Sequence, residues 1–162
     1  MSDFRDGVSA SFDPELFFAM ARKVGHGRAL GLEYRAHGED WVELALPWRP
    51  ELVSMPESGI MATGAIVSLV DTCSGASVWT ALGGFRAAVT LDLRLDYLRP
   101  ASEGETVIAR CECYKITRNV AFVRGVAHGG DEQRPIAHSA ATFVAVDQPA
   151  VVLRSSAFLS TS

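Results

Sequence analysis

The chain has 162 residues and a formal net charge of −4, with 48% hydrophobic and 21% charged residues. This length suits one domain with a true core, since such a domain buries about 70% of the surface of its unfolded chain. The negative charge excludes the broad positive field of a nucleic-acid-binding protein.

The start of the chain carries acidic residues and no apolar run, so it predicts no signal peptide. The cysteines are few and follow no disulfide or zinc-ligand spacing. We therefore expect a reduced, cytoplasmic protein without a metal or another cofactor. The cysteines themselves are best interpreted as core residues: Cys73, Cys111 and Cys113.

The N-terminal region predicts a short helix followed by strands. Asp13, Pro14 and Glu15 combine an N-cap, a proline at the first helical position and an early acid, which opens a helix. We expect this helix to end near Val24, with Gly25 and Gly27 closing it. Strand-like runs follow at residues 29–35 and 41–46.

The most informative segment lies between Glu57 and Arg86, where Asp71 is the one charged residue. The segment is apolar nearly all round and is followed by Gly83 and Gly84, so it predicts a long core helix. A membrane span is disfavoured, because a central aspartate costs about 2.5–3.5 kcal/mol on insertion. A buried carboxylate is costly unless it is paired, which makes Asp71 the leading candidate for function.

The rest of the chain predicts strands. Residues 89–97 alternate apolar and polar side chains, with Val89, Leu91, Leu93, Leu95 and Tyr97 on the apolar face. Further strands are expected at 105–116 and 120–128, joined by a turn at 117–119, and at about 136–146. This order predicts a mostly antiparallel sheet wrapped around one apolar helix.

Two short motifs resemble those of a known family. In GAIVSLVDTCSGASVW, Leu69 and Asp71 match an L-x-D pattern, and in VTLDLRLDYLRPA the residues Tyr97, Pro100 and Ala101 match a Y-x-x-P-A strand end. In this spacing and order they resemble the hotdog-fold thioesterases of the PaaI-like type. The resemblance implies an α+β hotdog fold, with an N-terminal segment at 1–28, the hotdog domain at 29–147 and a C-terminal tail at 148–162.

The resemblance also implies a function, the hydrolysis of acyl-CoA thioesters by a homodimer or homotetramer with its active site at the subunit interface. Asp71 falls on the catalytic general base or nucleophile. Thr90, after a one-residue gap, falls on a Ser or Thr that positions water in some members. Thr63 and Gly64 fall on the two glycines whose helix-start N–H groups polarise the thioester carbonyl. In other enzymes, such an N–H donor stabilises the transition state by about 2.7–4 kcal/mol.

Candidate contacts for the CoA phosphates are Arg99, Arg118 and Asn119, because a guanidinium suits a phosphate well. For any one arginine the competing interpretation is a solvated surface charge. Asp71 has a competing interpretation too, as a structural carboxylate that caps a segment or pairs with an arginine. Thr90 lies on the polar face of its strand, so it points at Asp71 only if a bulge intervenes.

Departures from the family pattern leave a second function open. The family histidine falls on Ala62, and an upstream Asn or Gln falls near Pro56, which has no N–H to donate. The main alternative is a hotdog protein that binds acyl-CoA or another acyl ligand without hydrolysing it. A hotdog hydratase ranks last, because it needs a histidine beside the carboxylate. Acyl specificity and the choice between dimer and tetramer do not follow from these patterns.

Overall fold

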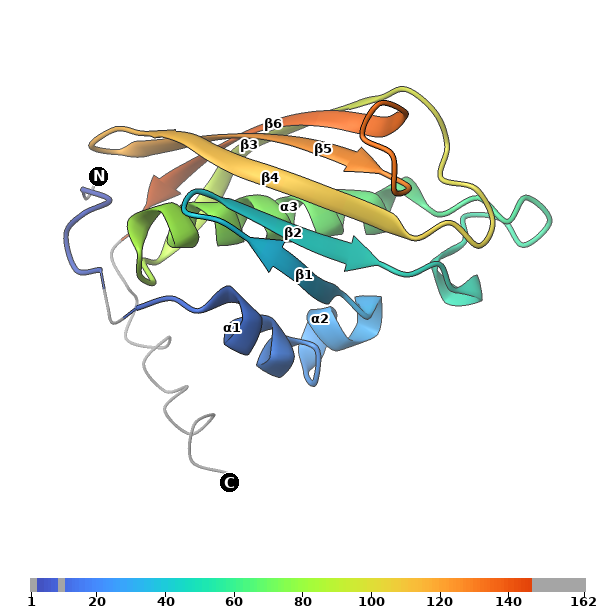
Figure 1. Cartoon of the computed structure of the whole chain (residues 1–162), viewed down its shortest axis with the longest axis horizontal. Helices are drawn as coiled ribbons and strands as arrows, with labels where there is room; N and C mark the ends of the chain where they lie inside the picture. The colour runs from blue at the N-terminus through green and yellow to red at the C-terminus, as the bar shows by residue number, and fades with distance from the viewer. Residues whose placement is uncertain (1–2, 9–10, 147–162) are drawn as a thin grey trace.

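The fold is one curved antiparallel sheet with a long helix against its inner face (Figure 1). A computed structural model describes residues 3–8 and 11–146. The elements are α1 Pro14–Ala21, α2 Gly25–Leu30, β1 Glu33–His37, β2 Trp41–Leu46, the 3-10 turn η1 Pro50–Leu52, α3 Thr63–Leu82, β3 Ala88–Tyr97, β4 Val107–Ile116, β5 Val120–His128 and β6 Pro135–Ala145. The sheet order is β1-β2-β4-β5-β6-β3, so β1 and β3 are the edge strands.

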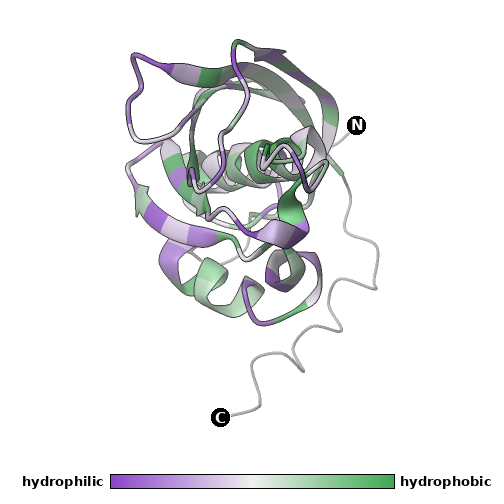
Figure 2. Cartoon of the chain, turned by 90° about the vertical axis from the view of Figure 1, so that its right-hand side faces the viewer, coloured by the Kyte–Doolittle hydropathy of each residue, from purple (hydrophilic) through white to green (hydrophobic). Residues whose placement is uncertain are grey.

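Helix α3 is the predicted core helix, and the hotdog arrangement is confirmed. Seen from the end of the molecule, the sheet curves around α3 (Figure 2). The N-terminal helix α1 packs beside the edge strand β1, and its Phe17 also contacts Trp79 of α3. Buried α3 residues such as Ile66, Leu69 and Cys73 pack mainly against β2 and β4. Gly83 ends the helix in the left-handed conformation, at φ 67°.

Among the described helices, α3 alone has the length and hydropathy of a membrane span. Half of its most apolar window is buried inside the fold, however, and the sheet covers that buried side. The apolar character of α3 is therefore explained by the core of this domain.

The prediction for the N-terminal region is only partly right. Asp13 caps α1 as expected, its carboxylate accepting from the Leu16 N–H at 3.1 Å. Gly25 was expected to close the first helix, but it opens a second helix, α2. The expected strand at 29–35 is therefore wrong in its first half. Gly31 then ends α2 with a left-handed φ of 70°, and β1 begins after it.

The predicted apolar face of residues 89–97 also holds for only part of β3. Leu93 and Leu95 are half-buried and pack against the core. Val89 and Leu91, which should share that face, are instead 48% and 64% exposed.

A β-bulge explains this reversal. The pairing of β3 with β6 skips between Thr90 and Asp92, so that Leu91 is the extra residue. An inserted residue inverts the inward and outward alternation of a strand. Before the bulge, therefore, it is Ala88 and Thr90 that face α3, and Ala88 packs against the core.

The C-terminal strands lie where the sequence predicts them. The turn between β4 and β5 is closed by the Thr117 N–H, which donates to the Val120 carbonyl at 2.8 Å. Cys73, Cys111 and Cys113 are buried free thiols, and burial raises the pKa of Cys113 to about 11. They are core residues, as expected. The predicted tail at 148–162 lies outside the described residues.

Candidate active site

The structure brings Asp71 and Thr90 together, although they come from different elements. The Thr90 hydroxyl donates a hydrogen bond of 2.8 Å to the Asp71 Oδ1. In the part of the chain that the structure describes, Thr90 is the one side chain bonded to Asp71. The other carboxylate oxygen, Oδ2, thus keeps its lone pairs for a water or a substrate.

Asp71 is less buried than the sequence predicts. It is half-buried on a strip of α3 made of Gly64, Ser68, Asp71 and Gly75, which follow one another at spacings of three and four. None of the four is fully buried, and a Cβ on Gly64 would meet nothing within 4 Å. This small-residue strip leaves room for a ligand or a second protein chain beside the carboxylate.

The first turn of α3 is the candidate oxyanion site. Ala62 is the N-cap and has no side chain that could accept from the helix N–H groups. Thr63 and Gly64 begin the helix and are exposed. Uncapped N–H groups at a helix N-terminus combine unsatisfied donors with the positive end of the helix dipole.

The Y-x-x-P-A motif holds this first turn in place. The Tyr97 hydroxyl donates to the Thr63 carbonyl at 3.2 Å, and the Met61 N–H donates to the Ala101 carbonyl at 3.2 Å. Both bonds tie the start of α3 to the end of β3. Sequence reasoning used Tyr97 as an apolar strand residue and, with Ala101, as a family marker, and it missed this positioning role.

The loop before α3, where the Asn or Gln of the family would lie, carries no side-chain amide. Pro56 and Glu57 are exposed in a turn before α3. In the same turn the Ser58 hydroxyl is committed to the Met55 carbonyl, at 2.8 Å. A donor for the thioester carbonyl is therefore best sought in the N–H groups of Thr63 and Gly64.

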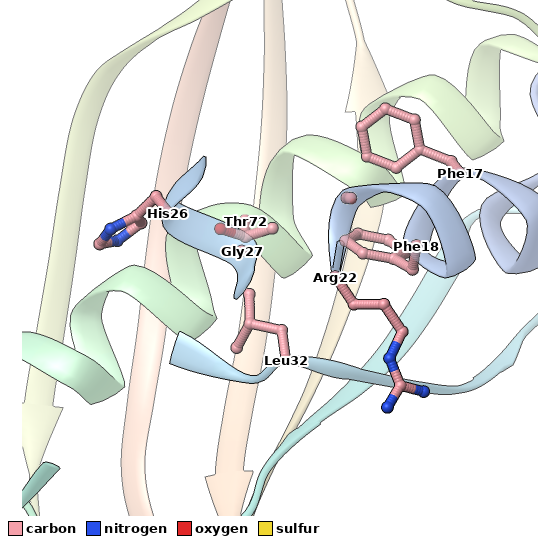
Figure 3. Close-up of a pocket in the computed structure, with 8 residues that line it drawn as sticks. Phe17, Phe18, Arg22, His26, Gly27, Leu32 and Thr72 are labelled. Carbon is pink, nitrogen blue, oxygen red and sulfur yellow. The ribbon is translucent and has the colours of Figure 1, made fainter. Parts of the chain in front are cut away.

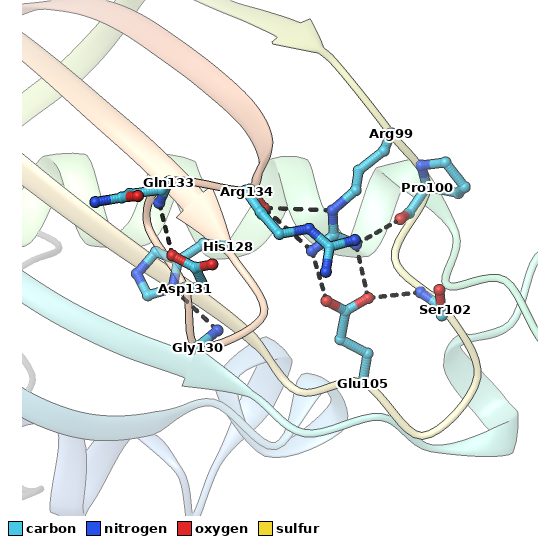
Figure 4. A network of polar contacts seen from close by, with 9 residues as sticks. All are labelled: Arg99, Pro100, Ser102, Glu105, His128, Gly130, Asp131, Gln133 and Arg134. Carbon is cyan, nitrogen blue, oxygen red and sulfur yellow. Dashed lines mark hydrogen bonds and ion pairs between the residues drawn. The ribbon is translucent and has the colours of Figure 1, made fainter.

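Arg99, a candidate for CoA binding, is engaged within the protein (Figure 4). Its guanidinium donates to both carboxylate oxygens of Glu105, at 2.9 and 2.7 Å. It also donates to the carbonyls of Arg134 and Pro100. The hydrogen bonds from Arg99 lower the pKa of Glu105. This geometry favours a structural role for Arg99 over phosphate binding.

Replacing Glu105 with glutamine is expected to destabilise the fold by about 1.5–3 kcal/mol at pH 7, the usual contribution of a hydrogen bond to a charged group. Because folding lowers the pKa of Glu105, its contribution is present at neutral pH. It is lost as the pH falls below the ordinary value of 4.5 and through the folded-state pKa. Urea denaturation at pH 7 and at pH 3.5 measures both effects.

The matched control is Glu112→Gln. Glu112 also forms a bidentate pair, with Arg124, but both side chains are more exposed. Exposed pairs contribute about 0–1 kcal/mol. An equal loss of unfolding free energy in the two variants would show that the hydrogen bonds of Arg99 do not stabilise the fold specifically.

Arg118 and Asn119 lie in the turn between β4 and β5. Thr90 pairs with Phe143 and Phe143 with Ala121, so this turn lies at the same end of the sheet as Thr90. Arg118 is 82% exposed, with Asp3 at 3.7 Å. The buried Asn119 Oδ1 has no hydrogen-bond partner among the described residues.

Comparison with known proteins identifies the family. Residues 58–136 match the thioesterase superfamily. The medium/long-chain acyl-CoA thioesterase YigI of Escherichia coli is 30% identical over 130 residues, which cover 72% of this chain and 83% of that protein. The chain belongs to the thioesterase superfamily.

Further comparisons agree with the fold. A crystallised protein of Pseudomonas aeruginosa is 39% identical, with a TM-score of 0.71, and the match covers 81% of this chain and 98% of that one. A relative from Haemophilus influenzae is 32% identical over 91 residues, but this chain spans only 64% of its length. The family match begins at residue 58, so α1, α2, β1 and β2 lie outside it.

Proposed function

We propose that this thioesterase-superfamily protein hydrolyses acyl-CoA thioesters, with Asp71 as the catalytic carboxylate and a PaaI-like arrangement of the site. The observation that carries the proposal is the 2.8 Å hydrogen bond from Thr90 to Asp71, formed across two elements through a bulge. A structural carboxylate is usually satisfied by an arginine or by several N–H groups. Asp71 has one hydroxyl donor and an accessible second oxygen.

The proposed reaction begins with a water held against Asp71 Oδ2. The carboxylate takes a proton from this water while the oxygen of the water attacks the thioester carbonyl carbon. The C–S bond then breaks, and the departing thiolate collects the proton that Asp71 had taken. A thiolate is a good leaving group, so no separate strong acid is needed. Thr90 holds the carboxylate so that Oδ2 faces the water.

The developing oxyanion would lie at the start of α3. The N–H groups of Thr63 and Gly64 are exposed and have no side-chain cap. They would donate to the carbonyl oxygen as negative charge gathers on it, a contribution of about 2.7–4 kcal/mol per donor in other enzymes. The bonds from Tyr97 and to Ala101 hold these donors in position before substrate arrives.

An isotope experiment separates the two roles open to Asp71. In a single turnover in H₂¹⁸O, general-base catalysis places ¹⁸O in the released acid. A nucleophilic Asp71 forms an anhydride, and attack of water on its aspartyl carbonyl releases an unlabelled acid while labelling Asp71. Thr90 bonds Oδ1 only, so either role would use the free Oδ2, and the position of the label distinguishes them.

We further propose a homodimer or homotetramer built on the edge strand β3. Val89 and Leu91 on this strand are 48% and 64% exposed, and Leu98 just after it is 59% exposed. An edge strand also presents unpaired N–H and carbonyl groups. A second copy that pairs with β3 would cover these groups and enclose Asp71 between subunits. In this arrangement the exposed Arg118 and the half-buried Asn119 are the candidate contacts for CoA.

Replacing Thr90 with valine is expected to lower kcat for acyl-CoA hydrolysis about tenfold, the effect of one lost hydrogen bond to a charged group. Valine keeps the shape of threonine, so KM and the melting temperature should stay close to those of the wild type. Thr90→Ser keeps the hydroxyl and should restore most of kcat. If valine and serine behaved alike, the hydroxyl would have no role in catalysis.

A further inference from the structure

A cavity of about 190 Å³ lies between the N-terminal helices and α3 (Figure 3). Phe17, Phe18 and Ala21 of α1 form one side of it, and Leu32 and Thr72 form another. Phe18 and Leu32 are 3% and 4% exposed, so its inner wall is part of the hydrophobic core. The cavity is therefore mainly apolar and is bounded by separate elements that pack against one another.

The cavity lies on the flank of α3 next to the candidate catalytic residue. Thr72 follows Asp71 in the chain, and successive helical residues are rotated by about 100°. Ser68 and Gly75 lie between these two directions when the helix is viewed along its axis. Small side chains therefore line the way around α3 from the carboxylate to the cavity.

The size and chemistry of the cavity fit a hydrocarbon. An apolar cavity of about 150 Å³ in another protein stays dry and binds benzene. No acidic side chain lines this cavity, and its ionisable members Arg22 and His26 are exposed at its rim. The half-buried Thr72 adds one hydroxyl, and the rest of the wall offers contacts for an aliphatic or aromatic group.

We propose that this cavity, the N-terminal cavity, receives the distal end of the acyl group and makes the protein select acyl chains longer than butanoyl. The inference rests on the proposed function, since it names the substrate class of the same site. Helices α1 and α2 lie outside the residues matched by the superfamily. Chain-length selection is therefore assigned to a segment outside the matched superfamily residues.

Close packing of α1 on α2 shapes the cavity. A Cβ on Gly27 would approach the Ala21 carbonyl oxygen to 2.8 Å, so a side chain at position 27 would push the helices apart. Filling the cavity is better done from Ala21, which lines it and ends α1.

The test compares Ala21→Phe with Ala19→Phe. Both variants add the same ring to α1, but Ala19 is exposed and does not line the cavity. Burial of each methylene changes affinity about fourfold. Ala21→Phe should therefore lower the ratio of kcat/KM for octanoyl-CoA over butanoyl-CoA at least about tenfold. Ala19→Phe should leave this ratio unchanged.

A second variant, Thr72→Leu, fills the cavity from α3 and covers the case in which Ala21→Phe does not fold, as judged by its thermal melt. An unchanged chain-length profile in a folded filling variant would overturn the proposal. If the wild type hydrolysed no acyl-CoA, the proposed function would fail on its own. Calorimetric binding of octanoyl-CoA and butanoyl-CoA would then test the cavity directly, and an unchanged affinity ratio in the filling variants would overturn it.

Discussion

Replacing Asp71 with asparagine is expected to lower kcat for acyl-CoA hydrolysis by about a hundredfold or more. General-base catalysis contributes about 10²–10⁴ to the rate, and an amide cannot accept the proton of water. Asparagine has nearly the shape of aspartate and can still accept from the Thr90 hydroxyl through its amide oxygen. KM and the melting temperature should therefore change little. Thiol release followed at saturating substrate measures the effect.

Asp92→Asn is the matched control for this variant. Asp92 follows the bulge in β3 and is exposed, so the same substitution is made on the same strand that holds Thr90. Its kcat should stay within about twofold of the wild type. A similar kcat in Asp71→Asn and Asp92→Asn would show that Asp71 is a structural carboxylate.

Replacing Leu91 with glutamate is expected to dissociate the proposed dimer and to abolish most of the activity. Leu91 projects from the bulge of an edge strand and is 64% exposed in the protomer. In a two-fold assembly each substitution occurs twice, and like charges brought together cost several kcal/mol. We expect the dissociation constant to rise at least about a hundredfold. The fraction of dimer, measured by sedimentation equilibrium, and kcat/KM should fall together over one series of protein concentrations.

Leu16→Glu provides the control for the added charge. Leu16 lies on α1 and is 57% exposed, close to the exposure of Leu91. It should leave both the assembly and the activity unchanged. An active, monomeric Leu91→Glu variant would refute a site enclosed between subunits while leaving the role of Asp71 intact.

The core of the fold could be predicted from the sequence because its pattern is local. An apolar segment with a single charged residue, ended by Gly83, and a series of alternating strands are sufficient to predict a helix inside an antiparallel sheet. The N-terminal helices were harder to predict. Gly25 and Gly31 are alike in sequence, yet one opens α2 and the other ends it. Which glycine does which depends on the packing of α2 against α1, and local sequence does not encode that packing.

For the candidate site, the sequence singles out Asp71 and Thr90 but does not predict how the two side chains meet. The sequence identifies Asp71 as an unusual charge, and it places Thr90 on the wrong face of its strand. Only the bulge at Leu91 turns Thr90 toward Asp71, and a bulge leaves no clear mark in an alternating pattern. Arg99 shows the opposite case, since its bonds to Glu105 depend on contacts that its own sequence neighbourhood does not reveal.

Multiple-turnover hydrolysis by the purified wild-type protein decides whether this protein is an acyl-CoA thioesterase. Octanoyl-CoA is supplied in large excess, and released thiol and free acid are both measured. We expect equal amounts of CoA and octanoic acid, at many times the amount of protein. Octanoyl-CoA that binds the protein but releases no thiol would contradict it and would identify an acyl-CoA-binding protein instead.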